Sequence, residues 1–393
     1  MRTVAAAWVF FLLLCSVNVS AESLSFRHKG ATLHTTHLST EIDPTYSKLA
    51  VVGGKHMRLV HSPVGTENVI VTLNSEGDLI AFDVNERKAL WRLSLLFSDA
   101  AVYSSGLIYS AGIVVCAVNN LIYGIDLGAG EIKWKGTLES FLSGGLVSLN
   151  EGESVAALTT GNYLYVFDVK TGGLIWHHEE MGADVRVRGS RTVAYDPVKH
   201  HVVLLLSDGR VSCFDSYSGD RVWDQVLGGE KSDLVGKINT SPVVAAGQIF
   251  VIDSAGALVS MDASSGNVVW KGEETGAYDI AAVGDVVLYY TVSRNGRTVA
   301  AIDAVTKEQR WALSLNEWSR RGRNKGGWST LVVSRGKLWV MGGGGYLLGI
   351  NVVSGIPEEI YTSSLFLDCA HSPVAMGSSL YVSAGRKGLM IVS

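Results

Sequence analysis

Acidic side chains recur along this chain at one fixed distance from a tryptophan. In six segments an aspartate precedes a tryptophan by eight residues: Asp83 and Trp91, Asp126 and Trp134, Asp168 and Trp176, Asp215 and Trp223, Asp262 and Trp270, and Asp303 and Trp311. A carboxylate can serve as a general acid or base, but it can also accept hydrogen bonds from the N–H groups of a turn. Because a repeat keeps its copies apart, we interpret each Asp as a turn residue. Each Trp is expected to be buried against the next repeat, which removes roughly 150–250 Å² from water.

Other groups that might be reactive predict no catalytic, cofactor or metal site. Neighbours on a strand point to opposite faces, so the pairs His177-His178 and His200-His201 do not easily share one ion. The run 342–345 is all glycine, but it leads from one expected strand into another, without the helix N-terminus that binds a phosphate. The chain has no Gly-x-Ser-x-Gly nucleophile elbow. We therefore expect no catalytic residue, cofactor, metal ion or small-molecule substrate.

The cysteines and the overall composition exclude several classes of protein. Beyond residue 21 the chain carries Cys116, Cys213 and Cys369, an odd and scattered set that indicates buried thiols rather than disulfides or a zinc site. Hydrophobic residues make up 47% of the 393 residues and charged residues 18%, which excludes a largely disordered chain. With 33 basic and 37 acidic residues, the chain lacks the cationic surface of a nucleic-acid binder.

One short segment is strongly basic. Residues 319–325 carry four cationic side chains between two expected strands: Arg320, Arg321, Arg323 and Lys325. They predict a secondary contact with an anionic partner or with lipid headgroups. The alternative is a solvated surface loop.

The segments that carry the Asp and the Trp form a repeat. The copies follow one another at intervals of 41 to 48 residues, a period typical of stacked supersecondary units, and a seventh copy has Asn351 and Glu359 in place of Asp and Trp. Each copy has the pattern of about four short strands, with a turn glycine four residues after the Asp or Asn in five copies: Gly130, Gly172, Gly219, Gly266 and Gly355. An eighth copy begins at Gly385. The predicted fold class is all-β, an eight-bladed β-propeller of four-stranded antiparallel blades.

The eighth copy ends at Ser393, before its outermost strand. Because an open sheet edge invites aggregation, we expect a strand over Thr45 to Val51 to pair there and close the ring. Residues 45–393 are then a single propeller domain, and residues 22–44 a flexible N-terminal lead.

Residues 1–21 have the three parts of a secretory signal peptide. Arg2 supplies the basic start, Val4 to Leu14 the apolar part, and Val19-Ser20-Ala21 the cleavage site. The apolar part is shorter than the roughly 20 residues that a membrane-spanning helix needs. Cys15 stands where a bacterial lipoprotein is lipidated, but the large Leu14 before it disfavours lipidation. We expect an exported protein.

The repeat resembles that of the PQQ-like, quinoprotein-type propellers, and among them the BamB family of outer-membrane protein assembly factors. The resemblance covers about residues 45–393 and rests on the Asp-to-Trp hairpins and on the stretch from Ile238 through Lys271. It implies a periplasmic scaffold of the BAM complex at the inner face of the outer membrane. Such a scaffold binds the POTRA domains of the barrel-assembly subunit BamA and assists unfolded outer-membrane proteins.

The resemblance also implies which residues bind the partner. The family's binding loop lies between blades three and four and reads apolar, any, apolar, Arg, Gly, which the sequence matches at Val185, Arg186, Val187, Arg188 and Gly189. Two apolar side chains beside an arginine can anchor a small interface, whereas the alternative is an ordinary strand. The chain departs from the family at Lys237 and Asn239, where acidic residues are usual.

A second class of function shares the blade pattern. PQQ-dependent dehydrogenases resemble this chain in their repeats, but they typically carry adjacent cysteines beside the cofactor and calcium-ligating acids. This chain has no Cys-Cys pair, so we favour the non-catalytic scaffold. A WD-repeat propeller is disfavoured because Asp follows the repeated Trp only at Trp223-Asp224.

Overall fold

A computed structural model of the chain describes most residues beyond 57 and one short strand before them. The described residues are 47–49, 58–86, 88–96, 101–180, 193–206, 209–227, 241–253, 256–274, 276–283, 286–293, 296–318, 328–329, 331–334, 336–342, 345–362, 373–376, 379–383 and 389–392. Both the predicted signal peptide and the predicted lead at 22–44 lie outside them.

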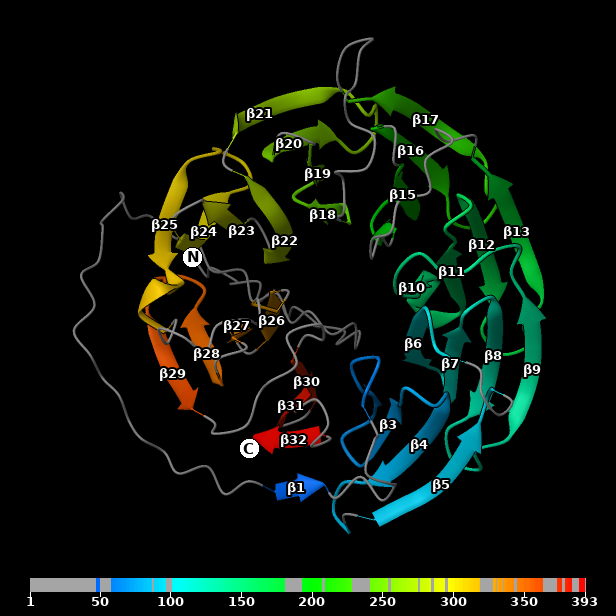
Figure 1. The fold of residues 1–393 in the computed structure, drawn as a ribbon. Helices are drawn as coiled ribbons and strands as arrows, with labels where there is room; N and C mark the ends of the chain where they lie inside the picture. The colour runs from blue at the N-terminus through cyan, green and yellow to red at the C-terminus, as the bar shows by residue number, and fades with distance from the viewer. Residues whose placement is uncertain are drawn as a thin grey trace, which may run out of the picture.

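The described strands form eight four-stranded antiparallel sheets arranged around a ring (Figure 1). In seven sheets the order in space follows the chain. Their strands are β2 to β5 (Val64–Gly65, Val69–Leu73, Asp78–Asp83, Lys88–Ser94), β6 to β9 (Ser105–Ser110, Ile113–Val118, Leu121–Asp126, Ile132–Thr137), β10 to β13 (Val147–Leu149, Ser154–Leu158, Tyr163–Asp168, Leu174–Glu179), β14 to β17 (Ala194–Asp196, His201–Leu205, Arg210–Asp215, Arg221–Val226), β18 to β21 (Val243–Ala245, Gln248–Ile252, Ala257–Asp262, Val268–Glu274), β22 to β25 (Ala277–Val283, Val286–Ser293, Gly296–Asp303, Gln309–Ser314) and β26 to β29 (Val332–Ser334, Lys337–Gly342, Tyr346–Asn351, Pro357–Thr362). The eighth sheet has the order β1, β32, β31, β30, with β30 Val374–Met376, β31 Ser379–Ser383, β32 Leu389–Val392 and β1 Ser47–Leu49.

Burial along each blade follows from its place between two neighbouring blades. A second strand such as β7 is buried at all six positions, because neighbouring sheets cover both of its faces. An outer strand such as β13 is exposed at most positions but buries its Trp176. Two short 3-10 turns, Asn150–Gly152 and Leu315–Trp318, complete the described elements.

Buried apolar clusters join the blades to one another. Eight clusters occur in the described part of the chain, and each takes residues from two neighbouring sheets. The cluster between the last sheet and the first contains Tyr381 and Leu389 on one side and Ile70 and Phe82 on the other. Apolar contact is therefore continuous around the ring.

The sequence predicted a ring of eight four-stranded blades, closed by a strand over Thr45 to Val51. The structure corrects this prediction, because the eight sheets are not equivalent blades. Only six sheets carry the Asp-to-Trp hairpin, and their outer strands contain Trp91, Trp134, Trp176, Trp223, Trp270 and Trp311. The sheet of β26 to β29 has Glu359 at that position, and the remaining sheet takes β1 as its outer strand. The strand β1 is described over Ser47–Leu49, and these three residues pair with Leu389 to Ile391 of β32. The ring thus combines six blades of the repeated kind with two built differently.

The antiparallel order sorts the connections onto two ends of the sheets. Turns between the second and third strands share one end with the connections that lead from an outer strand to the next blade. The hairpins that begin at the repeated Asp share the other end with the turns between first and second strands. We call these the connection end and the hairpin end. The strands on either side of the predicted partner-binding segment meet this rule: β13 ends and β14 begins at the connection end.

Candidate partner-binding surface

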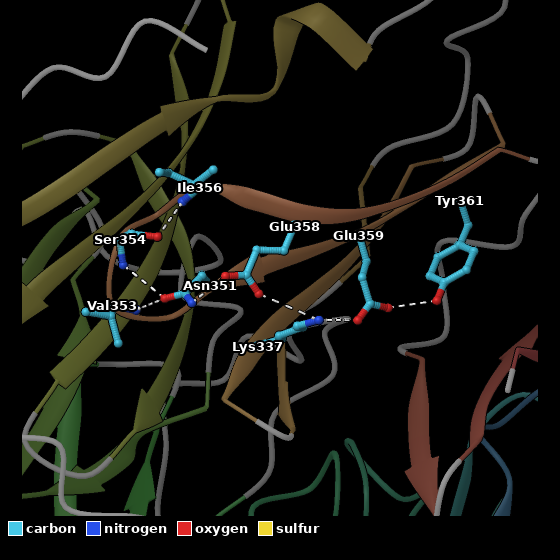
Figure 2. Close-up of polar contacts among 8 residues, drawn as sticks. All are labelled: Lys337, Asn351, Val353, Ser354, Ile356, Glu358, Glu359 and Tyr361. Carbon is cyan, nitrogen blue, oxygen red and sulfur yellow. Dashed lines mark hydrogen bonds and ion pairs between the residues drawn. The ribbon is translucent and has the colours of Figure 1, made fainter. Parts of the chain in front are cut away.

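The repeated aspartates hold the turns at the hairpin end. In Asp168 the Oδ1 atom accepts the backbone N–H of Thr171 at 2.7 Å and its hydroxyl at 2.8 Å. These hydrogen bonds stabilise the charged form and lower the pKa of Asp168 below its usual value. Asn351 accepts the N–H groups of Val353 at 2.9 Å and Ser354 at 3.1 Å in the seventh copy (Figure 2). The neutral amide therefore makes the same turn without a carboxylate.

Five of the repeated tryptophans reach into the next blade. Each indole N–H donates to the backbone carbonyl that follows the Asp or Asn of the neighbouring hairpin, and the acceptors are Leu127, Val169, Ser216, Ala263 and Val352 at 2.8 to 3.2 Å. The turn glycines lie beneath these rings with φ between 70° and 78°, which confirms the predicted positive-φ turns. The residues of the hairpin end thus hold each blade against the next one.

The blade of β18 to β21 departs from this pattern. In the hairpin of the next blade, Lys307 occupies the turn position of the glycine at φ 65°. The Lys307 ammonium donates to the carbonyl of Ala304, the position that an indole reaches in the other blades, and lies 4.7 Å from the centroid of the Phe250 ring. Burial lowers the pKa of this lysine. A side chain from the next blade therefore replaces the tryptophan's hydrogen bond.

In the blade of β26 to β29, an ion pair stands where the other blades have the repeated tryptophan. Lys337 forms an ion pair with Glu359, the residue at the Trp position, and its Nζ lies 3.6 Å from Glu358 Oε2 (Figure 2). The Tyr361 hydroxyl donates to Glu359 Oε2 at 2.7 Å. Glu359 is thereby held beside its own sheet, whereas Trp339 supplies the apolar contact to the eighth sheet.

The residues predicted from the resemblance lie outside the described part of the chain. This holds for the partner-binding residues Val185, Val187, Arg188 and Gly189, for the basic side chains Arg320, Arg321, Arg323 and Lys325, and for Lys237 and Asn239. The residues on either side of the segment 181–192 are described. Glu180 is buried and forms an ion pair with Arg221 of the next blade, and Val193 is buried in the cluster between the two blades. These contacts fix where the predicted binding segment leaves one blade and enters the next.

The connection end also carries an exposed aromatic pair that the sequence analysis missed. Tyr103 precedes β6 and Phe141 precedes β10, and their rings stack with centroids 6.0 Å apart and an angle of 5° between the planes. Tyr103 is 75% exposed and Phe141 43% exposed. Neither residue belongs to the repeated hairpin. The only sign of the pair in the sequence is that two successive connections each carry an aromatic residue.

Carboxylates of the same blades lie toward the same end. Glu139 is exposed two residues before Phe141, and its backbone N–H donates to the Tyr165 hydroxyl at 3.3 Å. Glu179 ends β13 and accepts the Tyr163 hydroxyl at 2.9 Å. The hydrogen bond to Glu179 is the main reason why the pKa of Tyr163 is raised, and the Glu139 charge adds to it. This part of the surface is therefore both aromatic and acidic.

Both described cysteines are buried thiols, as the sequence predicted. Cys116 and Cys213 are buried, and burial raises the thiol pKa of Cys213 to about 12 and that of Cys116 still further. Cys369 lies outside the described residues. Among the residues that the structure describes, no three His, Cys, Asp or Glu side chains gather closely enough to hold a metal ion. Nor is any described helix long and apolar enough to cross a membrane.

Comparison with known proteins identifies the family. The family described as outer membrane protein assembly factor BamB matches residues 75–313, which include the repeated hairpins from β4 through β25. The chain belongs to the BamB family. The resemblance noted in the sequence is thereby confirmed, with its PQQ-like repeat and its link to outer-membrane protein assembly.

Individual BamB relatives are distant. The Yersinia pestis protein is 24% identical over 336 residues, covering 80% of this chain and 79% of that protein. The Bordetella pertussis protein is 29% identical over 167 residues, covering 41% and 40% of the two chains. The Escherichia coli K12 protein is 28% identical over 184 residues, or 45% and 43%. With the Bordetella and Escherichia proteins, the similarity thus spans less than half of each relative.

Solved structures show that the fold is shared more widely than the family. BamB from Moraxella catarrhalis matches with a TM-score of 0.65 and 17% identity, over 85% of this chain and 97% of that one. A europium-containing methanol dehydrogenase matches with a TM-score of 0.59 and 11% identity, over 83% of each chain. A BamB protein and a methanol dehydrogenase therefore share this architecture, so the fold by itself does not assign an activity.

Proposed function

We propose that this protein is a non-catalytic periplasmic scaffold of the β-barrel assembly machinery at the inner face of the outer membrane. It binds the POTRA domains of a BamA-like subunit and assists the folding and insertion of outer-membrane proteins. The observation that carries the proposal is the family match over residues 75–313, which spans the segment 181–192 and both blades that flank it. The alternative, a PQQ-dependent dehydrogenase, has the fold in its favour but no metal-ligating cluster among the described residues.

The partner contact is assigned to Val185, Val187, Arg188 and Gly189, with Arg320, Arg321, Arg323 and Lys325 as a secondary contact. Support comes from the topology of the described strands: β13 and β25, which precede the two segments in the sequence, are both outer strands that end at the connection end. The arginines favour an acidic partner surface, because a guanidinium pairs with a carboxylate through two hydrogen bonds.

The binding of unfolded outer-membrane proteins is assigned to the outer strands of the sheets. Each is the last strand of its sheet, and several expose an aliphatic side chain near the Trp: Leu90, Ile132, Leu174, Val222 and Val268. A free strand edge with apolar side chains suits the addition of an extended β-barrel segment.

In-cell photo-crosslinking tests the partner assignment. A photoreactive residue at position 187 is expected to trap the barrel-assembly subunit, whereas one at Val198, which is 85% exposed at the hairpin end, is expected to trap none. Equal trapping from both positions, or trapping from neither in the folded exported protein, contradicts the proposal.

A thermal-shift measurement tests the enzyme alternative. Adding PQQ with calcium ions is expected to leave the unfolding midpoint unchanged, because a scaffold has no site for them. A cofactor present at 100 times its Kd stabilises a protein by about 2.7 kcal/mol, so a dehydrogenase would show a clear rise.

A further inference from the structure

The aromatic pair Tyr103 and Phe141 is held in place by backbone hydrogen bonds. Asn119 Oδ1 accepts the Tyr103 N–H at 2.8 Å, and Asn119 Nδ2 donates to the Ala101 carbonyl at 3.0 Å. The Phe141 carbonyl accepts the N–H of Thr160, in the turn after β11, at 2.7 Å. Both rings are thus presented on an ordered backbone, and a partner that covers them loses little conformational entropy.

The exposure of the pair is costly unless something covers it. Tyr103 and Phe141 expose two stacked aromatic rings to water at 75% and 43% of their surface. Aromatic side chains of this kind are enriched at protein interfaces, where a few of them carry most of the binding energy.

The charges beside the pair define the chemistry of what covers it. Glu139 is exposed two residues before Phe141, and Glu179 lies across the same blade, hydrogen-bonded to Tyr163. Aromatic faces next to carboxylates favour a guanidinium or ammonium group, which stacks on a ring and pairs with an acid. The complementary surface is therefore a basic segment of a protein, with an arginine or lysine beside an apolar residue.

The position of the pair links it to the proposed partner contact. Phe141 is bonded to the turn between β11 and β12, and the same sheet ends in β13, which leads into the segment 181–192. Phe141 and the end of β13 thus lie at the same end of one blade. A domain bound beside the end of β13 is well placed to reach the pair.

We propose that Tyr103 and Phe141, together with Glu139 and Glu179, form a second contact for the POTRA-domain partner and receive a basic segment of it. The inference rests on the proposed function, because it takes the same partner. It adds a residue-level assignment: the aromatic pair and the two carboxylates take a basic part of the partner.

Binding of the purified POTRA-domain fragment of the barrel-assembly subunit to the full mature protein tests the inference, by calorimetry at two salt concentrations. The double variant Tyr103→Ser/Phe141→Ser is expected to weaken Kd by about tenfold, as for loss of an aromatic hot spot. Val198→Ser is the matched control, since Val198 is more exposed than either ring but lies at the hairpin end, and it is expected to bind like the wild type.

Charge variants separate the acidic contribution from the aromatic one. Glu139→Gln/Glu179→Gln is expected to weaken binding about threefold at low salt and to flatten its salt dependence, because surface ion pairs are screened by salt. Glu151→Gln, at an exposed acid of the hairpin end, is the control and is expected to change neither quantity.

The outcomes distinguish this inference from the proposed function. If the wild type binds and the Tyr103/Phe141 variant binds equally well, the second contact is wrong while the proposed function stands. If the wild type does not bind the fragment, both are wrong. If sedimentation shows a dimer of the chain that the double serine variant abolishes, the pair contacts a second copy instead, which also overturns the inference.

Discussion

At the scale of single residues, a turn glycine decides how closely two blades pack, because it has a hydrogen atom where other residues have a Cβ. Gly130 has φ 70°, and a Cβ atom there would lie 2.6 Å from Trp91 Cδ2. Glycine is required for two independent reasons, because an L side chain is strained at this φ and the indole already occupies the space. The aspartate that begins the turn and the glycine that ends it thus serve the tryptophan of the preceding blade.

The first prediction compares two glycines of one turn. Gly130→Ala is expected to lower the free energy of unfolding by about 2 kcal/mol or more, because it combines strain at positive φ with overpacking against Trp91. Gly128→Ala is the control, since its Cβ meets only Asp126 Oδ1 at 3.5 Å and its φ is not positive. Urea unfolding measures both. Equal effects contradict the packing role of Gly130.

The second prediction concerns the pH dependence of one carboxyl group. Burial raises the pKa of Asp279 to about 6, although the N–H groups of Leu331 and Ile280 donate to it at 2.9 and 3.0 Å. The folded state therefore binds this proton more tightly than the unfolded state does. The contribution to stability is full below about pH 4 and is lost as the pH rises through 6.

Asp279→Asn isolates that contribution. Between pH 4 and pH 7 the wild type is expected to lose about 1–2 kcal/mol of unfolding free energy relative to the variant, which carries no titrating group at this position. Chemical unfolding across the pH range gives the difference curve. A flat difference, or one that rises with pH, contradicts the raised pKa.

At the scale of the element, one hairpin shows how a repeat tolerates an exception. Lys307 stands where five hairpins have glycine, and its ammonium donates to Ala304 and Gln248, with Ser260 Oγ at 3.3 Å. Those groups belong to two neighbouring blades. The hairpin β24 to β25 therefore keeps the blade contact through a side chain of its own.

The third prediction tests this replacement. Lys307→Met keeps the length of the side chain but removes the donor, so it is expected to destabilise the protein by about 1–2 kcal/mol. Lys170→Met changes an exposed lysine of the corresponding turn in another blade and is expected to have no effect. Thermal unfolding of the two variants measures the difference. Equal midpoints would show that the Lys307 contacts contribute nothing.

At the scale of the whole molecule, the ring depends on a contact between distant parts of the chain. β1 pairs with β32 through Ser47, Lys48 and Leu49, and the first and last sheets share a buried cluster. The short pairing covers the edge of β32, which would otherwise be an open strand edge.

The fourth prediction removes that strand. A chain that begins at Ala50 is expected to unfold at a temperature a few degrees lower than one that begins at Thr45, and to aggregate faster, because β32 loses its partner. Thermal unfolding and light scattering compare the two chains. Identical behaviour would show that the apolar cluster alone closes the ring.

Much of the fold could be predicted because its determinants are local. An Asp that caps a turn and a glycine that allows positive φ act within a few residues, so the hairpins at Asp126 and Asp168 were recognisable in the sequence. The substitute contacts of Lys307 and Glu359 were not predicted. They depend on the register and spacing of separate sheets, which no local pattern encodes.

The same distinction between local and tertiary determinants holds for the candidate site. The sequence by itself determined the period, the turn chemistry and the family, because each is written in neighbouring residues repeated along the chain. Only the tertiary structure decided that Tyr103 and Phe141 stack and that acids lie on the same side of their blades. The physical reason is that two connections far apart in sequence meet only when the ring brings the ends of adjacent sheets together.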